Sequence, residues 1–289
     1  MPEGIICSAI GGFYEIKNGE SLYTCKAKGL FRHKGLIPLP GDKVVFETQK
    51  DGYARIEKVL ERRNTIKRPA VANIDTLFIV LSAQLPEPDF LLADKLILEA
   101  VKNNIEPILI INKIDSADIA LLEKIDTQYK CFSLLQVSTY VNKGIDLVKK
   151  RINNHICCFA GQSGVGKSSI INSLFQSTIM KTGVISNKTE HGRHTTRETR
   201  LFECCGGYIF DTPGFSLLET EGFDASILLK AYPEFVTDKP CRFLGCNHIH
   251  EPGCAVKEKI TSGEVDLDRY KRYIILYEEF ENRRKHRYD

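Results

Sequence analysis

The chain has 289 residues, 43% of them hydrophobic, a length that suggests about two domains and permits three small ones. No stretch reaches the ~18 apolar residues of a membrane span, and Met1 to Cys7 lack the basic and apolar regions of a signal peptide, so we expect a cytoplasmic protein with no membrane partner. The net charge is +3, but residues 1–68 hold 13 Lys and Arg against 8 Asp and Glu, which favours a polyanionic partner.

The first 60 residues predict a small all-β unit. Runs rich in β-branched and aromatic residues cover 5–16, 21–31, 42–48 and 53–60, and turn residues separate them. Four or five strands of this length are typical of a barrel of OB or SH3-like type. Its aromatic residues Phe13, Tyr14, Tyr23 and Phe31 alternate with Lys17, Lys26, Lys28, Arg32 and Lys34. Rings that stack on bases beside cations that contact phosphates suit RNA; the alternative is that the rings form the core.

The middle of the chain alternates strands with helices. The charged segment 61–69 is predicted to be a link without periodicity. Continuous apolar runs at 75–81, 107–112, 132–137 and 156–160 predict buried strands, and helical spacing at 89–104, 119–129 and 144–152 predicts the helices between them. This alternation indicates a parallel α/β sheet. Ligands bind at the carboxyl ends of such strands, so we expect Asn112, Ser138 and Gly161 to line one pocket.

A phosphate-loop motif follows the strand at 156–160. Residues 161–168 match the pattern G-x-x-x-x-G-K-[ST], and a helix is predicted directly after it. In this arrangement backbone N–H groups and the helix N-terminus surround a phosphate. Lys167 is expected to reach the β- and γ-phosphates, and the Ser168 hydroxyl to bind Mg²⁺. The predicted phosphate-binding residues are Gly161, Gln162, Ser163, Gly164, Val165, Gly166, Lys167, Ser168 and Ser169.

The sequence Asn-Lys-Ile-Asp at 112–115 ends the strand at 107–112. A carboxylate can accept hydrogen bonds from the N1–H and 2-amino groups of guanine, which adenine does not offer there. Asp115 is therefore predicted to select GTP over ATP. The alternative is that Asp115 caps the helix predicted to begin near Ile119.

The neighbours of Asp115 complete the predicted base site. The Lys113 stem can pack on the plane of the base, and Asn112 can tie this loop to the phosphate loop. Ser138 and Thr139 are expected to support guanine from the other side. The predicted ligand is GTP or GDP.

Two later segments are typical of the parts of a GTPase that sense the γ-phosphate. The polar residues 181–200 predict a mobile loop, in which Thr195 or Thr196 can bind Mg²⁺ when the γ-phosphate is present. In the sequence Asp-Thr-Pro-Gly at 211–214, Asp211 is predicted to face Mg²⁺ through water, and the Gly214 N–H to contact the γ-phosphate.

Phe215 stands where many GTPases carry a water-orienting Gln, so either hydrolysis is slow or another group orients the water. His191 and His194 lie in the mobile loop and are the candidates, the alternative for each being a solvated loop histidine. The predicted catalytic residues are His194, Lys167, Thr195 and Thr196.

Three Cys and one His lie close together near the C-terminus. Cys241, Cys246, His248 and Cys254 have a spacing that suits a closed, structural Zn²⁺ site, with His250 as a rival imidazole; the alternative is unliganded cysteines. The other seven cysteines are expected to behave as small apolar residues. A helix predicted at 267–286 ends in basic residues, which either complement its dipole or contact RNA.

The order of the motifs is unusual. In most GTPases the phosphate loop precedes Asn-Lys-x-Asp, whereas here 112–115 precedes 161–168 and 211–214 follows both, which predicts a circularly permuted domain. Over its whole length the chain resembles the ribosome small-subunit-dependent GTPase A family (RsgA, also called YjeQ or YloQ). The resemblance implies a GTPase that binds the small ribosomal subunit and its rRNA late in maturation, with hydrolysis stimulated by the subunit. It also places the family's switch histidine on His194 and its zinc ligands on Cys241, Cys246, His248 and Cys254.

We therefore expect three units: an N-terminal all-β OB-like barrel that binds RNA at 1–64, a circularly permuted α/β P-loop GTPase domain at 65–220 and a zinc-binding helical domain at 221–289. We expect a monomer that holds one structural Zn²⁺, and Mg²⁺ together with GTP. The alternative function is a GTP-dependent RNA- or ribosome-binding module whose slow hydrolysis is incidental.

Overall fold

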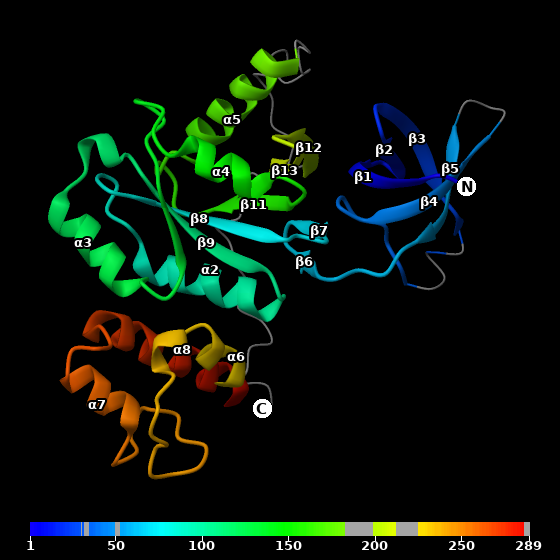
Figure 1. Cartoon of the computed structure of the whole chain (residues 1–289). Coiled ribbons are helices and arrows are strands. Elements are labelled where there is room, and N and C mark those ends of the chain that lie inside the picture. Colours follow the sequence, from blue (N-terminus) through cyan, green and yellow to red (C-terminus); the bar gives the residue numbers. More distant parts are fainter. Residues whose placement is uncertain (30, 32–34, 50–52, 183–198, 212–224, 286–289) are drawn as a thin grey trace.

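In the computed structural model a barrel, a six-stranded sheet with helices on both faces and a helical C-terminal unit follow one another along the chain (Figure 1). The structure describes residues 1–29, 31, 35–49, 53–182, 199–211 and 225–285, and for 177–182 and 211 the backbone only.

The N-terminal strands are β1 (Glu3–Ile10), β2 (Phe13–Asn18), β3 (Ser21–Ala27), β4 (Lys43–Thr48) and β5 (Ala54–Val59). They close in the order β1-β2-β3-β5-β4, with β3 parallel to β5, so the predicted OB-like barrel is confirmed. The segment 5–16 was expected to be one strand, but Gly11 and Gly12 have φ values of 58° and 85° and turn the chain between β1 and β2.

The six-stranded sheet contains β8 (Thr76–Ser82), β9 (Glu106–Asn112), β10 (Ser133–Gln136), β11 (Ile156–Ala160), β12 (Arg200–Cys204) and β13 (Gly207–Asp211). Its order is β10-β9-β8-β11-β13-β12, and only β12 pairs antiparallel. The predicted α/β fold is confirmed. Because neighbouring parallel strands end at one edge, the loops after β8, β9, β10 and β11 meet there.

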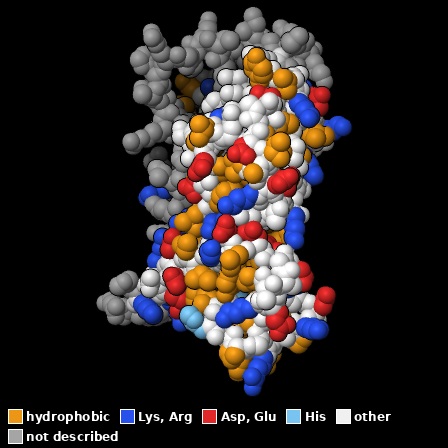
Figure 2. All heavy atoms as spheres, turned by 90° about the vertical axis from the view of Figure 1, so that its left-hand side faces the viewer, with side chains coloured by type: hydrophobic (Ala, Val, Ile, Leu, Met, Phe, Trp, Pro, Cys, Tyr) orange, Lys and Arg blue, Asp and Glu red, His pale blue; other side chains and the backbone are white. Residues whose placement is uncertain are grey.

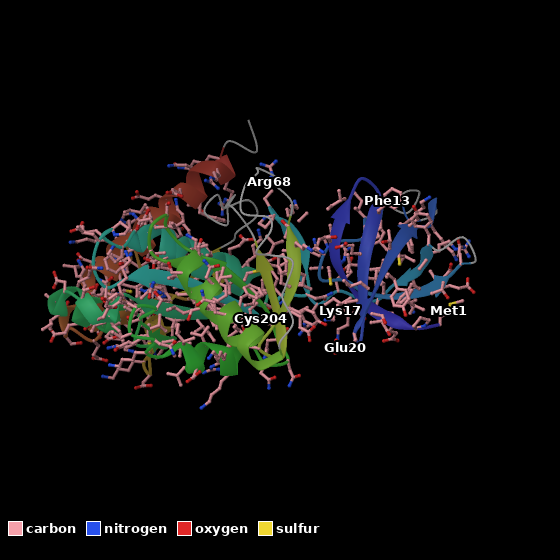
Figure 3. The ribbon with its side chains drawn as sticks, turned by 90° about the horizontal axis from the view of Figure 1, so that it is seen from above. Met1, Phe13, Lys17, Glu20, Arg68 and Cys204 are labelled. Carbon is pink, nitrogen blue, oxygen red and sulfur yellow. The ribbon has the colours of Figure 1, made fainter. Side chains whose placement is uncertain are left out.

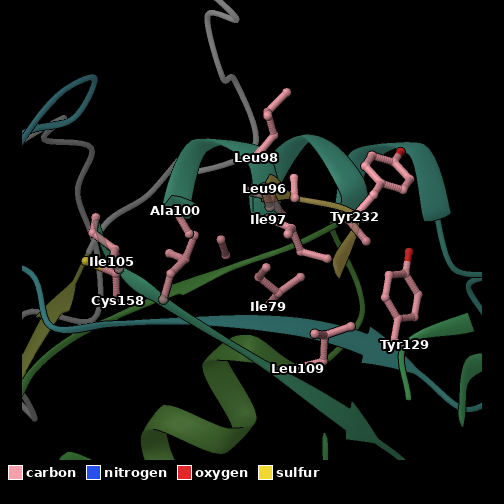
Figure 4. Close-up of a cluster of buried hydrophobic side chains, with 14 of the residues drawn as sticks. Ile79, Leu96, Ile97, Leu98, Ala100, Ile105, Leu109, Tyr129, Cys158 and Tyr232 are labelled. Atoms are coloured by element: carbon pink, nitrogen blue, oxygen red, sulfur yellow. The ribbon is translucent and has the colours of Figure 1, made fainter. Parts of the chain in front are cut away.

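Helices cover both faces of the sheet. They are α2 (Phe90–Lys102), α3 (Ile119–Gln128), α4 (Ile145–Ile152) and α5 (Lys167–Thr182). Ile79 of β8 packs in one buried cluster with residues of α2 and α3, whereas Phe78 packs in another with residues of α4 and α5. Successive residues of a strand point to opposite faces, which is why β8 is apolar throughout. Figure 4 shows Leu96 and Ile97 of α2 over Ile79 and Leu109 of the sheet.

The charged segment 61–69 was expected to be an irregular link, but part of it forms a hairpin of β6 (Thr65–Lys67) and β7 (Ala70–Ala72). This hairpin joins the barrel to the sheet. The Ala72 N–H donates to the Pro40 carbonyl at 3.0 Å, and Gly41 has a φ of +91°. A Cβ atom at Gly41 would lie 2.1 Å from the Ala72 carbonyl oxygen, so only glycine fits at this junction.

Ion pairs also join the barrel to the sheet. Arg200 of β12 contacts Glu15 of β2 at 2.7 Å, and Lys17 of β2 pairs with Glu203 of β12. Figure 3 shows Lys17 on the side of the barrel that faces the end of β12. Both pairs are partly exposed, so they orient the barrel more than they stabilise it.

The C-terminal unit contains α6 (Ala225–Lys230), the 3₁₀ turn η3 (Pro233–Phe235), α7 (Ala255–Thr261) and α8 (Leu267–Lys285). It lies against the face of the sheet that α2 covers (Figure 1). Figure 2 shows acidic and basic side chains interspersed over the face of the molecule that includes this unit. The described helices contain none with the length and apolar character that crossing a bilayer requires.

A buried acid on α2 joins the C-terminal unit to the sheet. Asp94 is 1% exposed and pairs with Arg269 and Arg272 of α8, the second at 2.6 Å. The Tyr129 and Tyr232 hydroxyls donate to the same carboxylate at 2.7 and 3.2 Å. Arg269 is itself 1% exposed and also pairs with Glu234 of η3 at 2.7 Å. Each buried charge therefore has partners, as burial requires.

We predict that Asp94→Asn lowers the free energy of unfolding by ~3–5 kcal/mol, because it leaves two buried guanidinium groups without their shared anion. Thermal and urea unfolding of the variant and the wild type measure this. The matched control is Asp268→Asn, which removes half-exposed ion pairs with Lys124 and Lys271 at 3.2 and 3.3 Å. That control should change stability by less than ~1 kcal/mol; equal losses in the two variants would show that the Asp94 pairs are not special.

Candidate functional site

Three glycines shape the loop between β11 and α5. Gly161, Gly164 and Gly166 have φ values of +133°, +83° and +97°. A Cβ atom would lie 2.4 Å from the Val80 carbonyl oxygen at Gly161, and 2.2 Å from the Asn112 side-chain nitrogen at Gly166. The loop can therefore follow this path only with glycine at these positions.

The remaining loop residues divide between the interior and the open side. Val165 is fully buried and anchors the loop, whereas Ser163, Ser168 and Ser169 are exposed. The Lys167 ammonium donates to the Gly161 and Gln162 carbonyls, both at 2.7 Å, so it lies within the loop. Burial lowers the pKa of Lys167, and an anion held in the loop would favour its charged form.

The loop after β9 is tied to the phosphate loop. The buried Asn112 side chain donates to the Val165 carbonyl at 2.9 Å. The Lys113 ammonium donates to the Gly164 and Leu85 carbonyls at 3.0 and 2.6 Å. Lys113 has a φ of +65°, which turns the chain sharply at the end of β9. The structure thus brings together the two segments whose motifs the sequence singled out.

Asp115 is exposed beside the loop that follows β10. The Ser138 hydroxyl donates to the Asp115 carboxylate at 2.5 Å, and this hydrogen bond lowers the pKa of Asp115 and keeps it ionised. Thr139 follows Ser138 and is half-buried. The N-cap of α3 is Asp118, which accepts from the Leu121 N–H at 3.2 Å. The alternative reading of Asp115 as the cap of that helix is therefore wrong.

Sequence reasoning missed the loop between β8 and α2. This loop contributes the Leu85 carbonyl to Lys113, and the Asp89 N–H donates to the Gln162 side chain at 3.2 Å. These contacts use backbone groups, so side-chain chemistry gave no signal for them. Asp89, directly after a Pro and before an apolar run, could have been recognised as the N-cap of α2, a role that the structure shows.

Part of the predicted site lies outside the described residues: His191, His194, Thr195, Thr196, Gly214 and Phe215. Asp211 ends β13, which pairs parallel to β11, and its backbone alone is described. The roles expected for these residues stay predictions.

Cys241, Cys246, His248 and Cys254 form a second cluster, in the C-terminal unit. Their ligand atoms all lie within 4.8 Å of one another. The His248 Nδ1 atom is 3.6, 3.5 and 3.3 Å from the Sγ atoms of Cys241, Cys246 and Cys254. Three thiols and one imidazole converging in this way fit a metal ion. The rival imidazole, His250, does not belong to the cluster.

The loop that carries His248 is held by α8 and by a carboxylate. The Tyr270 hydroxyl donates to the His248 carbonyl at 2.6 Å, and the Tyr273 hydroxyl to the Asn247 carbonyl at 2.8 Å. Burial would raise the pKa of Glu251, but backbone N–H groups of the loop donate to it and bring the pKa to about 2. The donors are Asn247, Ile249 and His250. The loop that carries the Cys and His cluster is thus also held by groups outside the cluster.

The glycine loop, the carboxylate that follows β9 and the permuted order of the two motifs define a circularly permuted P-loop GTPase. Family comparisons agree, since the family described as RsgA GTPase matches residues 59–221 and the RsgA N-terminal domain matches residues 3–56. The chain belongs to the RsgA GTPase family, which confirms the resemblance, the fold class and the prediction of a GTP-hydrolysing enzyme.

Named relatives match the whole chain. A protein of Ruminiclostridium cellulolyticum named small ribosomal subunit biogenesis GTPase RsgA is 43% identical, covering 96% of this chain and 93% of its own. One of the same name from Halalkalibacterium halodurans is 38% identical over 100% of both chains.

Two solved structures are also similar. YjeQ from Thermotoga maritima has a TM-score of 0.82 and 33% identity, covering 96% of this chain and 98% of its own. YloQ, described as a circularly permuted GTPase, has a TM-score of 0.80 and 30% identity, covering 98% and 96%. The predicted domain boundaries at 64 and 220 are not tested by these matches and stay predictions.

Proposed function

We propose that this chain is a GTPase that binds the small ribosomal subunit and assists its late maturation, with GTP hydrolysis stimulated by the subunit. The observation that carries the GTP-binding part of the proposal is the direct link between the two nucleotide loops, in which Asn112 and Lys113 donate to carbonyls of the phosphate loop. Relatives named small ribosomal subunit biogenesis GTPase support the choice of partner. We further propose that the chain works in the cytoplasm as a monomer.

In this proposal the loops recognise GTP and GDP from opposite ends. Asp115, ionised and oriented by Ser138, accepts from the guanine N1–H and 2-amino groups, while Thr139 supports the base. The phosphate loop holds the phosphates through its backbone N–H groups and Lys167. Ser168 supplies a hydroxyl for Mg²⁺, and Asp211 and Gly214 face the metal and the γ-phosphate.

The barrel offers the rRNA a platform for stacking. The aromatic residues singled out in the sequence differ in exposure. Tyr14 and Phe31 are buried in the barrel core, whereas Phe13 is 41% exposed. Phe13 lies 5.9 Å from Tyr53, which is equally exposed and which the sequence did not single out. The Lys26 ammonium lies 5.2 and 4.9 Å from the two ring centroids. We propose that bases stack on these rings while Lys26 meets a phosphate.

We propose that the cysteine and histidine cluster holds one structural Zn²⁺. Four protein ligands, Cys241, Cys246, His248 and Cys254, complete a tetrahedral shell and leave no position for a substrate. The metal would fix the long loop between η3 and α7, which has little regular structure of its own.

We predict one Zn²⁺ per chain in protein purified without added metal, measured by elemental analysis. Cys254→Ser should lose most of this zinc and lower the temperature of unfolding, because the tetrahedral shell is broken. Cys131→Ser, at an exposed cysteine outside the cluster, is the matched control and should retain the metal. A folded wild-type chain without metal would refute the site.

We predict that Asp115→Asn weakens the binding of GDP and improves that of xanthosine diphosphate (XDP). The amide offers a donor to the 2-oxo group of xanthine, whereas the carboxylate needs the 2-amino donor of guanine. Calorimetric titration of both nucleotides with both proteins gives the four dissociation constants. Parallel losses for GDP and XDP would mean that Asp115 does not read the base.

Hydrolysis needs a group that orients the attacking water, since Phe215 cannot. We propose His194, because it precedes Thr195 and Thr196, one of which binds Mg²⁺ in this proposal. Closure of that threonine over the metal would bring the imidazole toward the γ-phosphate, where it can polarise water. Contact with rRNA would favour this closed arrangement. The small subunit would then stimulate hydrolysis by positioning the His194 imidazole next to the attacking water.

We predict slow hydrolysis by the chain alone and strong stimulation by small ribosomal subunits. His194→Ala should lose about 10²-fold or more of the stimulated rate with little change in GTP affinity. His155→Ala, at an exposed histidine directly before β11, is the control and should behave as wild type. If subunits bind but do not stimulate the wild type, the chain is instead a GTP-dependent binding module. If the His194 variant is stimulated as strongly as the wild type, the group that orients the water is another one, such as His191.

A further inference from the structure

Two adjacent cysteines, the turn pair Cys204 and Cys205, lie at the end of the hairpin of β12 and β13. β12 ends at Cys204, which pairs with Gly207, so Cys205 and Gly206 form a two-residue turn. Both turn residues have positive φ values, 54° and 78°. Turns of this kind favour Asn, Asp or Gly at the first position, so a cysteine there holds a conformation that side chains rarely adopt. Such a position points to a role for the side chain.

The turn brings the two thiols together. The Sγ atoms of Cys204 and Cys205 are 3.4 Å apart. The backbone of the turn is fixed from outside the hairpin, because the Asn154 N–H donates to the Gly206 carbonyl at 2.9 Å. Cys204 is fully buried, whereas Cys205 is only partly buried. The pair therefore offers one thiol to solvent and keeps the second thiol in contact with the first.

A second pair of adjacent cysteines, the strand pair Cys157 and Cys158, shows that adjacency alone does not produce this contact. The strand pair lies in β11, where successive side chains point to opposite faces of the sheet. Cys157 packs in one buried cluster and Cys158 in the other, and both are fully buried. The contact within the turn pair is thus a product of the turn and not of the sequence Cys-Cys.

We propose that Cys204 and Cys205 are a reversible dithiol–disulfide pair, oxidised by exchange with a small-molecule disulfide, RSSR, such as oxidised glutathione. The Cys205 thiolate attacks one sulfur of RSSR, a mixed disulfide forms on Cys205, and RS⁻ leaves and takes up the proton that Cys205 lost. The Cys204 thiolate then attacks the Cys205 sulfur, the bond between the two cysteines forms, and the second RS⁻ leaves as RSH. Two thiols are thereby oxidised and one RSSR is reduced to two RSH. The proposal does not depend on the nucleotide site.

The disulfide of the turn pair is expected to be easy to reduce. Adjacent Cα atoms are about 3.8 Å apart across a trans peptide, below the range of roughly 4.4–6.8 Å that disulfides usually span. Such a bond is strained, and strained disulfides are the ones that cellular thiols reduce again. The pair therefore suits a transient oxidation and not a permanent cross-link. Glu203, directly before Cys204, pairs with Lys17, so the oxidation takes place beside the junction with the barrel (Figure 3).

Mass spectrometry of the wild-type chain tests the proposal. The native protein is treated with excess oxidised glutathione, the remaining thiols are alkylated, and trypsin places the turn pair in the peptide 201–230 and the strand pair in the peptide 152–167. We expect the peptide 201–230 to lose two hydrogens and to carry no alkyl group, and dithiothreitol to restore both thiols. The peptide 152–167 should keep both thiols. The exposed Cys131 should carry glutathione, which shows that the oxidant has reacted.

A turn pair that keeps both thiols while Cys131 is modified would overturn the proposal. Equal oxidation of the two pairs in the native chain would also overturn it, because adjacency alone would then be sufficient. In urea the contrast between the pairs should disappear, and a contrast that persists there would show that the fold does not cause it.

Variants of the turn pair test the order of the two steps. Cys204→Ala should stop at the mixed disulfide on Cys205, since the second thiol is missing. Cys205→Ala should leave Cys204 unmodified, since Cys204 is fully buried. Absence of the mixed disulfide in folded Cys204→Ala would refute Cys205 as the thiol that reacts first, and a mixed disulfide that persists on Cys205 of the wild type would refute closure by Cys204.

Discussion

A single buried carboxylate determines how the C-terminal unit is attached to the rest of the chain. Asp94 lies in the interior between α2 and α8, and its charge is tolerated only because Arg269, Arg272 and two tyrosine hydroxyls surround it. Such pairs add less to stability than their number suggests, since each charge has lost its water. They are instead demanding in geometry, because a wrong placement of α8 would leave charges buried without partners. The orientation of the C-terminal unit follows from this requirement.

The circular permutation leaves the nucleotide site intact because the site depends on neighbouring strand ends and not on chain order. β11, which leads into the phosphate loop, lies between β8 and β13, and β9 lies on the far side of β8. The contact between Asn112 and Val165 therefore crosses the end of β8, where the Leu85 carbonyl joins it through Lys113. Any connection of these strands that preserves their order and direction gives the same loops at the same edge.

Sequence patterns predicted the features that depend on neighbouring residues, such as strands and the phosphate loop. They could not predict contacts between residues far apart in the chain. Apolar runs located β8, β9, β10 and β11 of the sheet, although not the antiparallel edge strand β12, and the glycine spacing located the phosphate loop with its positive φ values. Phe13 and Tyr14 are neighbours in β2, so their side chains point to opposite faces of the barrel wall, and only Phe13 is exposed. Because 5–16 was expected to be one strand, the two side chains were not assigned to faces, and both were candidates for RNA binding. Nothing in the sequence marks Arg269 as the partner of Asp94, since the two are 175 residues apart and an arginine on a polar helix is ordinarily solvated.

α2 contacts both the phosphate loop and the C-terminal unit. Its first turn begins at Asp89, whose N–H is held by Gln162 of the phosphate loop, and Asp94 one turn further on is held by α8. Arg269 and Arg272 cannot part from Asp94 without leaving buried charges unpaired. Contacts therefore run from the phosphate loop through α2 to α8, and from α8 through Tyr270 and Tyr273 to the loop around His248.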